Sequence, residues 1–182
     1  VEKTDAAADK VLNSHSTANV IYALWLSPDG VYKMSQEIKG MVQTSLNLGT
    51  AYLDTDKLVY KYLIRSNTAA GKKLLLERVT TFAKHLSGKV VTMSDYPAWA
   101  YKSDSQLRKR CVENFTNVYG HEPEVTSIHA GLECGILAGK MPGVDMISFG
   151  PTLESVHTPD ECMNVASVER TWEYLLEIIK RL

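Results

Sequence analysis

The segment Lys57–Ile64 constrains the fold of this chain more than any other stretch. It is rich in β-branched and aromatic residues, and every second position places such a residue on one face of a strand: Leu58, Tyr60, Tyr62 and Ile64. A second, partly alternating segment, Val42–Tyr52, comes before it and ends near the turn residues Asp54–Asp56. Because the connection is so short, the two segments are predicted to pair as an antiparallel hairpin.

A helix and one more strand are expected after the hairpin. The segment Gly71–Leu86 carries a stripe of apolar side chains at helical spacing: Leu75, Val79, Phe82 and Leu86. Lys89–Met93 is a short apolar run and is expected to be a strand, and Ala18–Leu26, before the hairpin, is expected to be a helix. The order strand, strand, helix, strand predicts an α+β sandwich with one open sheet face over residues 1–95.

A second part is expected over residues 96–182, because the composition changes at the linker-like segment Ser94–Ala100. Ser103 and Gln106 form a capping box, which predicts a helix that runs to about Tyr119. Two strands and two more helices are expected after it: Glu124–Ile128, a helix from about Leu132, Val144–Ser148 and a helix after Ser167. The fold class predicted for the chain is therefore α/β, an α+β portion followed by an α/β layered portion.

Composition excludes several classes of partner. The 20 Lys and Arg residues are balanced by 21 Asp and Glu residues, so no general attraction to nucleic acid or to a membrane is expected. No apolar run approaches the roughly 20 residues that span a bilayer, and the first residues lack the apolar core of a signal peptide. Three cysteines without framework spacing fit a reducing cytosol. The chain begins with Val1 and not with Met, as a fragment would.

Polar side chains that can bind metals or transfer protons occur in two loops, each just after a short apolar run. Such runs are expected to be buried strands that hold the loops in place. The side chains expected to gather at one end of a sheet are His129, Glu133, Cys134, His157, Asp160 and Glu161. The loop of His157 gives the stronger signal, because Pro151 and Pro159 stiffen it and Gly150 permits backbone geometry that other residues resist.

Each of these candidates has a plainer interpretation. His157 suits a metal ligand held at a fixed angle, and it equally suits a histidine on the surface. Glu161 could accept a hydrogen bond from the His157 ring or from a backbone amide, or it could be a solvated carboxylate. Glu133 and His129 could be a pair of ligands or an acid/base pair, and Glu133 could instead cap the following helix.

Two further side chains are open to two interpretations each. Cys134 could be a nucleophile with a histidine as its base, although a small buried thiol is favoured. Arg65, at the end of the predicted strand, could clamp a carboxylate through two parallel hydrogen bonds or could simply be exposed. Spacing alone does not decide between these interpretations.

Four motifs carry a resemblance to known enzymes: Ile128–Gly135, Gly150–Thr152 with His157–Glu161, Gln43–Gly49 and Leu63–Ser66. Together they resemble the C-terminal part of the aminoacyl-histidine dipeptidases, a group within the di-zinc metallopeptidase family that includes the carnosinases. Ile128–Gly135 is similar to a signature of these enzymes. Gly150–Thr152 together with His157–Glu161 is similar to their terminal zinc-ligand loop. Gln43–Gly49 and Leu63–Ser66 resemble their lid domain. The similarity covers nearly the whole chain and is weakest near its start.

This resemblance implies a role for each candidate. His157 would be a zinc ligand, Arg65 would bind the substrate carboxylate, and three residues would support or line the pocket: His129, Glu133 and Glu161. It also implies a dipeptide substrate, two zinc ions (or manganese or cobalt) and a metal-activated water that attacks the peptide carbonyl. Residues 1–95 would be part of a lid and dimerisation domain, and residues 96–182 the last segment of the catalytic domain. The intact enzyme would be a cytoplasmic homodimer.

The chain departs from the family pattern in one respect. The remaining metal ligands and the general base of these enzymes belong to motifs upstream of the lid, and these motifs do not occur here. Because a catalytic zinc takes about three protein ligands, we expect a dipeptidase fragment that is inactive alone. Two alternatives stay open. One is a non-catalytic dimerisation or peptide-binding module of the same fold, and the other is an unrelated thiol enzyme that uses Cys134.

Overall fold

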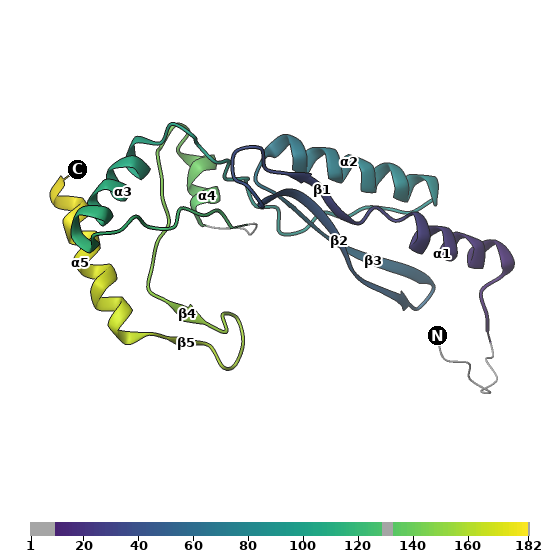
Figure 1. Ribbon diagram of the computed structural model, residues 1–182. Coiled ribbons are helices and arrows are strands. Elements are labelled where there is room, and N and C mark those ends of the chain that lie inside the picture. Colours follow the sequence, from purple (N-terminus) through teal and green to yellow (C-terminus); the bar gives the residue numbers. More distant parts are fainter. Residues whose placement is uncertain (1–9, 129–132, 182) are drawn as a thin grey trace. The chain divides into compact units, whose positions relative to one another are not determined.

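The computed structural model describes residues 10–128 and 133–181 and divides into two compact units (Figure 1). Unit 1 comprises Val1–Gln36 and Gly40–Asp95, and unit 2 comprises Glu37–Lys39 and Tyr96–Leu182. Helices are mixed with antiparallel strands, in agreement with the predicted α/β class. Among the described residues, no helix has the length and apolar character that crossing a membrane requires.

Unit 1 is built on a three-stranded antiparallel sheet in the order β1-β2-β3. The strands are β1 (Gly30–Met34), β2 (Val42–Asp54) and β3 (Lys57–Ser66). The predicted hairpin of β2 and β3 is confirmed, with a register that runs from Asp54 opposite Lys57 to Thr44 opposite Ser66. Its turn is tight, and Thr55 adopts a φ of 51° there. The strand β1 is not among the elements predicted from the sequence.

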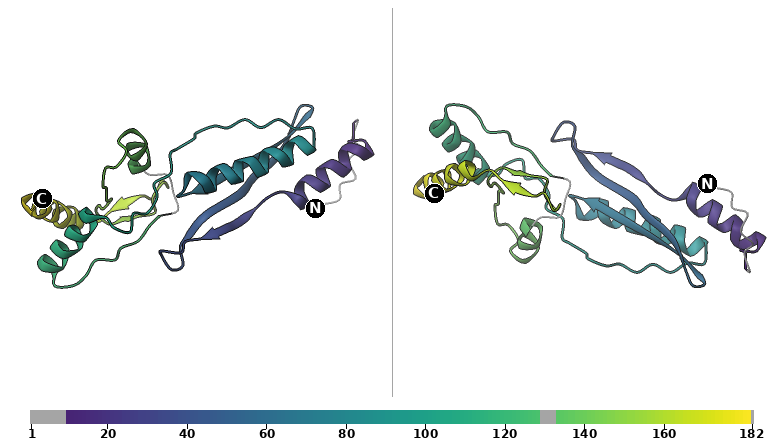
Figure 2. Two further views of the ribbon diagram at one scale, coloured as in Figure 1. Left: turned by 90° about the horizontal axis from the view of Figure 1, so that it is seen from above. Right: turned by 90° about the horizontal axis from the view of Figure 1, so that it is seen from below.

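One face of this sheet is covered by α2 (Ala69–His85), as the views from above and below also show (Figure 2). The core between them is a cluster of fully buried and half-buried side chains: Leu46, Leu75, Val79, Tyr32, Tyr62 and Ile64. The alternation seen in Lys57–Ile64 therefore separates a core face from an outer face, and Leu63 on the outer face is 50% exposed. The helix α1 (Ser14–Leu26) comes before the sheet and begins with Asn13 as its cap.

Unit 2 packs two long helices against each other, α3 (Gln106–Tyr119) and α5 (Val165–Arg181). Buried and half-buried side chains fill this contact: Cys111, Tyr174, Ile178, Leu107, Phe115, Tyr119 and Ile147. The Tyr174 hydroxyl donates a hydrogen bond of 2.7 Å to the backbone oxygen of Cys111. The unit also holds the short helix α4 (Glu133–Lys140) and a small hairpin of β4 (Leu153–Glu154) and β5 (Cys162–Met163).

Three predicted strands are absent from the described part of the chain. The segments Lys89–Met93, Glu124–Ile128 and Val144–Ser148 belong to no ladder, and Val91 is 78% exposed. A strand needs a neighbour to bond its backbone, and the described residues provide none for these segments. The sheet end at which the candidate residues were expected to gather is consequently not formed by these segments.

Two local predictions for unit 2 also need correction. The cap of α3 is Ser105 and not Ser103, because the Ser105 hydroxyl accepts the backbone N–H of Arg108 at 3.0 Å. Along α5, the buried positions include Tyr174 and Ile178. The stripe that the sequence predicts to be buried comprises Val168, Trp172, Leu175 and Ile179. It is largely exposed instead, and Trp172 is 59% exposed.

Candidate functional site

The loop that carries His157 is organised by its own hydrogen bonds. It connects β4 to β5, and the backbone oxygen of Ser155 accepts both the N–H and the hydroxyl of Thr158, at 3.1 and 2.7 Å. The backbone oxygen of Thr158 in turn accepts a hydrogen bond from the backbone N–H of Glu161, at 3.1 Å. The base of the hairpin is tied to α5, because Thr152 donates its N–H to the Ser167 hydroxyl at 2.9 Å. The loop is therefore held in shape although its side chains are exposed.

His157 has an unusual backbone conformation in this loop. Its φ of 65° lies in the left-handed region, and Ser155, two residues earlier, has a φ of 53°. The carboxylate of Glu161 accepts the backbone N–H of His157 at 2.6 Å. Of the alternatives left open for Glu161, the structure thus shows a bond to a backbone amide. The Glu161 carboxylate thus accepts from the main chain of His157, and the His157 side chain is exposed.

The other loop is described only in part. His129 lies outside the described residues, so its expected role stays a prediction. Glu133 is the first residue of α4 and is exposed, a position at which the helix dipole favours a carboxylate. The next residue, Cys134, is half-buried, and Gly135 is buried, so close to Pro97 that a Cβ there would lie 2.6 Å from the Pro97 oxygen.

Arg65 lies in unit 1, on β3, opposite Ser45 of β2. Its side chain alternates with that of Ile64, which packs in the core, so Arg65 belongs to the outer face of the sheet. Arg65 and His157 therefore come from different units, and each is placed only within its own unit.

A hydroxyl cluster next to Arg65 was missed by the sequence analysis. The Thr44 and Ser66 hydroxyl oxygens lie 2.9 Å apart, and those of Ser66 and Thr68 lie 3.3 Å apart. Thr68 caps α2 by accepting the N–H of Gly71 at 3.2 Å. The sequence feature that indicates this cluster is a pair of hydroxyl residues, Ser66 and Thr68, just before a helix. Thr68 stands three residues before Gly71, which is the spacing of a helix cap.

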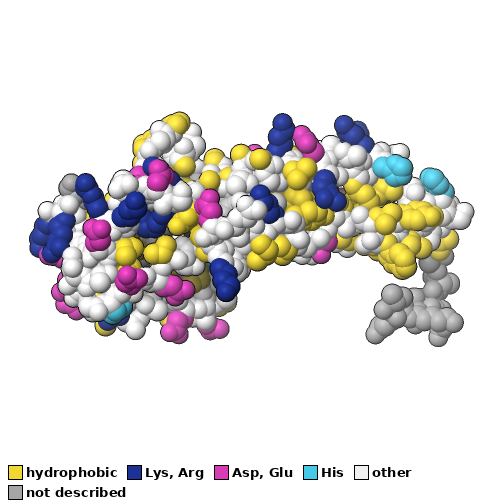
Figure 3. Space-filling model, turned by 45° about the horizontal axis from the view of Figure 1, so that its top comes forward, with side chains coloured by type: hydrophobic (Ala, Val, Ile, Leu, Met, Phe, Trp, Pro, Cys, Tyr) yellow, Lys and Arg dark blue, Asp and Glu magenta, His cyan; other side chains and the backbone are white. Residues whose placement is uncertain are grey.

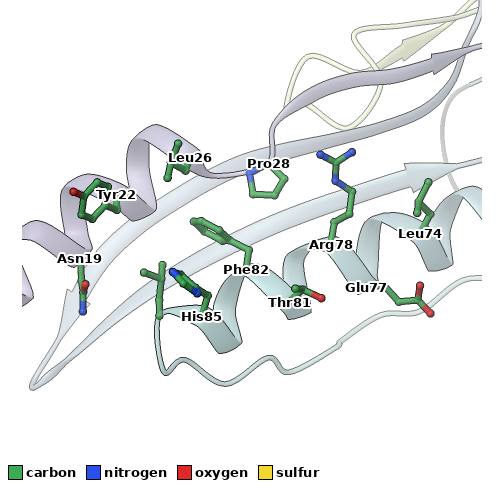
Figure 4. A pocket seen from close by; sticks show the side chains of 11 residues that line it. Asn19, Tyr22, Leu26, Pro28, Leu74, Glu77, Arg78, Thr81, Phe82 and His85 are labelled. Carbon is green, nitrogen blue, oxygen red and sulfur yellow. The ribbon is translucent and has the colours of Figure 1, made fainter.

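Unit 1 holds an open groove of about 850 Å³ between α1 and α2 (Figure 4). Its walls include Tyr22 and Leu26 of α1 and Phe82 of α2, and Arg78, Glu77 and His85 add polar groups. Hydrophobic side chains also gather on the surface at the end of unit 1 that holds α1 (Figure 3), and Trp25 there is 86% exposed. None of the candidate site residues from the sequence that the structure describes lines this groove.

A complete metal site is not formed by the described residues. Among residues 10–128 and 133–181, no group of three or more His, Cys, Asp or Glu side chains could hold a metal ion. His157 alone would supply one ligand, whereas zinc takes three or four protein ligands. The residues present thus do not by themselves fit the di-zinc centre that the sequence resemblance implies.

The model of peptidase family M20/M25/M40 matches residues 9–181, which is almost the entire chain. The chain belongs to this family. Within the family, it is 33% identical over 177 residues to the cytosol non-specific dipeptidase of Escherichia coli. The match covers 97% of this chain and 36% of the relative, so the chain spans about a third of the length of that protein.

Two solved structures are similar to the chain. The aminoacylhistidine dipeptidase of Vibrio alginolyticus superimposes with a TM-score of 0.86 at 32% identity, over 97% of this chain and 36% of that one. The aminopeptidase PepT of Bacillus cereus superimposes with a TM-score of 0.60 at 18% identity, over 90% of this chain and 44% of that one, a likeness of fold. The resemblance inferred from the motifs is thereby confirmed.

Proposed function

We propose that this chain is part of a metal-dependent dipeptidase that hydrolyses Xaa-His and other dipeptides in the cytoplasm. The observation that carries the proposal is the 0.86 TM-score to an aminoacylhistidine dipeptidase over nearly the whole chain. The similarity to a cytosol non-specific dipeptidase supports a broad range of dipeptides and a cytoplasmic location. Zinc is the proposed metal, with manganese or cobalt as alternatives.

In this proposal, His157 contributes one ligand to the metal centre. Its loop is held by hydrogen bonds, and its imidazole is exposed. Arg65 would bind the substrate carboxylate, since a guanidinium can make two parallel hydrogen bonds to it. Glu133 and His129 would line or support the pocket. We assign no reaction step to this chain alone, because the described residues offer one metal ligand where about three are needed.

The proposed assembly is a homodimer through the first unit, with the remaining ligands supplied by other parts of the intact enzyme. Large apolar side chains at the surface support additional contacts, with Trp25 of α1 86% exposed and Trp172 of α5 59% exposed. Extensive apolar exposure of this kind is typical of surfaces that another polypeptide covers.

The decisive experiment measures zinc content and Xaa-His hydrolysis for this chain alone and after mixing with the part of the dipeptidase fold that its relatives carry outside the matched region. We expect activity only in the mixture, and we expect His157→Ala to abolish it. Asp160→Ala, in the same loop, is the matched control and should retain activity. Tight zinc binding and turnover by the chain alone would overturn the proposal.

A non-catalytic dimerisation or peptide-binding module is the second candidate. It is favoured by the lack of a metal-binding group among the described residues and by the groove between α1 and α2. Calorimetric binding of dipeptides without added metal, together with no hydrolysis in the mixture, would select this candidate. A thiol enzyme that uses Cys134 would lose its activity on selective alkylation, whereas the proposed dipeptidase would keep it.

A further inference from the structure

The backbone of His157 requires a specific restraint. A non-glycine residue in the left-handed region is disfavoured by steric crowding of its Cβ, and such conformations persist only where the surroundings enforce them. His157 has a φ of 65° within an exposed loop, so burial does not supply the restraint. Hydrogen bonds must do so instead.

Two hydrogen bonds act on this backbone. The bond from the Thr158 N–H to the Ser155 oxygen closes a β-turn in which His157 is the third residue, the position at which a type II turn has a positive φ. Among the described residues, the bond formed by His157 is the one from its backbone N–H to the Glu161 carboxylate, at 2.6 Å. An ionised acceptor makes this a charge-assisted bond, stronger than a bond between neutral groups.

We infer that Glu161 is a positioning residue that adds to the turn a second restraint on the His157 backbone, and thereby helps to set the direction in which the imidazole points away from the loop. The direction of the Cα–Cβ bond follows from the backbone, so a restraint on the main chain is also a restraint on the ring. Because Glu161 bonds the main chain, it leaves both ring nitrogens to other partners. The geometry of residues 155–161 supports the restraint itself. That the restraint serves to orient a metal ligand rests on the proposed function.

Amide hydrogen exchange, measured by NMR on the 182-residue chain, tests the geometry. In Glu161→Ala the His157 amide should exchange roughly tenfold faster, because it has lost its acceptor. Glu161→Gln should restore most of the protection, since its amide oxygen can accept the same bond. Asp160→Ala, the neighbouring carboxylate, should leave the exchange rate unchanged. Equal protection in the native chain and in Glu161→Ala would overturn the inference, and so would a loss of protection in Glu161→Gln as large as in Glu161→Ala.

A second measurement connects the geometry to function. In the mixture with the complementing segment, the zinc affinity should fall roughly tenfold or more for Glu161→Ala and should recover in Glu161→Gln at matched thermal stability. An unchanged zinc affinity in Glu161→Ala would mean that Glu161 does not position a ligand. If the amide responds as expected while no mixture hydrolyses a dipeptide, the proposed function fails and the role of Glu161 in orienting His157 stands.

Discussion

The carboxylate of Asp145 accepts the backbone N–H of Leu107 at 3.0 Å, across 38 positions of the sequence. Leu107 lies in the first turn of α3, where backbone N–H groups have no partner within the helix. The hydroxyl of Ser105 satisfies the next donor, that of Arg108. The start of α3 is thus capped twice. Ser105, directly before the helix, provides one cap, and Asp145, from the segment predicted as a strand, provides the other.

Replacing Asp145 should destabilise unit 2 in a pH-dependent way. The hydrogen bond from Leu107, with a smaller contribution from Ser105, lowers the pKa of Asp145 below its usual value. A lowered pKa means that the stabilisation is present above the ordinary value of 3.8 and is lost as the pH falls through the lower pKa of the folded state. We expect Asp145→Ala to reduce the free energy of unfolding by about 1 kcal/mol near neutral pH.

Urea unfolding at neutral and at acidic pH measures this effect. The native chain should lose stability on acidification, and Asp145→Ala should lose less of it because the titrating group is gone. Asp160→Ala, which removes an exposed carboxylate, serves as the control. The interpretation is wrong if both variants are as sensitive to acid as the native chain.

Tyr174→Phe should remove an alkaline sensitivity from the same unit. Burial raises the pKa of the Tyr174 hydroxyl to about 12, and the neutral hydroxyl donates to the Cys111 oxygen. A raised pKa means that the stabilisation is complete below the ordinary value of 10.0 and is lost as the pH rises towards 12. Phenylalanine should cost about 1 kcal/mol below that range, for the lost bond, and should flatten the alkaline decline. Unfolding curves across this range would show it, and an unchanged alkaline decline would contradict it.

Gly71→Ala should destabilise unit 1 even though alanine is the better helix former. A Cβ at Gly71 would lie 2.6 Å from the hydroxyl oxygens of both Ser66 and Thr44, and 2.9 Å from that of Thr68. These contacts are closer than packing allows, so we expect a loss of about 1–3 kcal/mol where helix propensity alone would give a gain. Thermal unfolding measures the sign of the change.

The control for Gly71 removes the obstruction. In a background that carries Thr44→Ala and Ser66→Ala, the same Gly71→Ala change should cost much less, because two of the three oxygens are absent. An equal cost in both backgrounds would show that backbone conformation, and not the hydroxyl cluster, requires glycine.

The hairpin and the helix α2 of unit 1 could be predicted from the sequence because they are locally determined, whereas the strand expected at Lys89–Met93 of the same unit does not form. Lys57–Ile64 has a strong strand alternation, its partner is joined through a tight turn, and α2 carries one apolar stripe. Each of these features depends on neighbours in sequence. The strand β1 was missed because its residues, Gly30–Met34, are few and weakly patterned.

Unit 2 was predicted less well because its apolar segments depend on partners distant in sequence. Val144–Ser148 is apolar enough for a buried strand, but a strand forms only where another strand bonds it. In α5, apolar residues occupy two stripes, and the sequence does not say which of them meets α3. The residue types at His157 and Glu161 indicated a site, whereas the left-handed backbone at His157 could not be read from them.

That left-handed backbone leads to a last prediction, which separates stability from function at His157. Glycine adopts a φ of 65° without steric cost, whereas any other residue is strained there. We therefore expect His157→Gly to be about 1 kcal/mol more stable than His157→Ala, as measured by urea unfolding. At Asp160, whose φ is not positive, the same pair of substitutions should show the opposite order, since glycine raises the entropy of the unfolded chain.

Both His157 variants should lose zinc from the mixture with the complementing segment. A glycine variant less stable than the alanine variant would mean that the loop does not hold this conformation in solution. The expected order would mean that the chain accepts strain at His157 so that an imidazole can occupy the position, as happens where function and stability conflict.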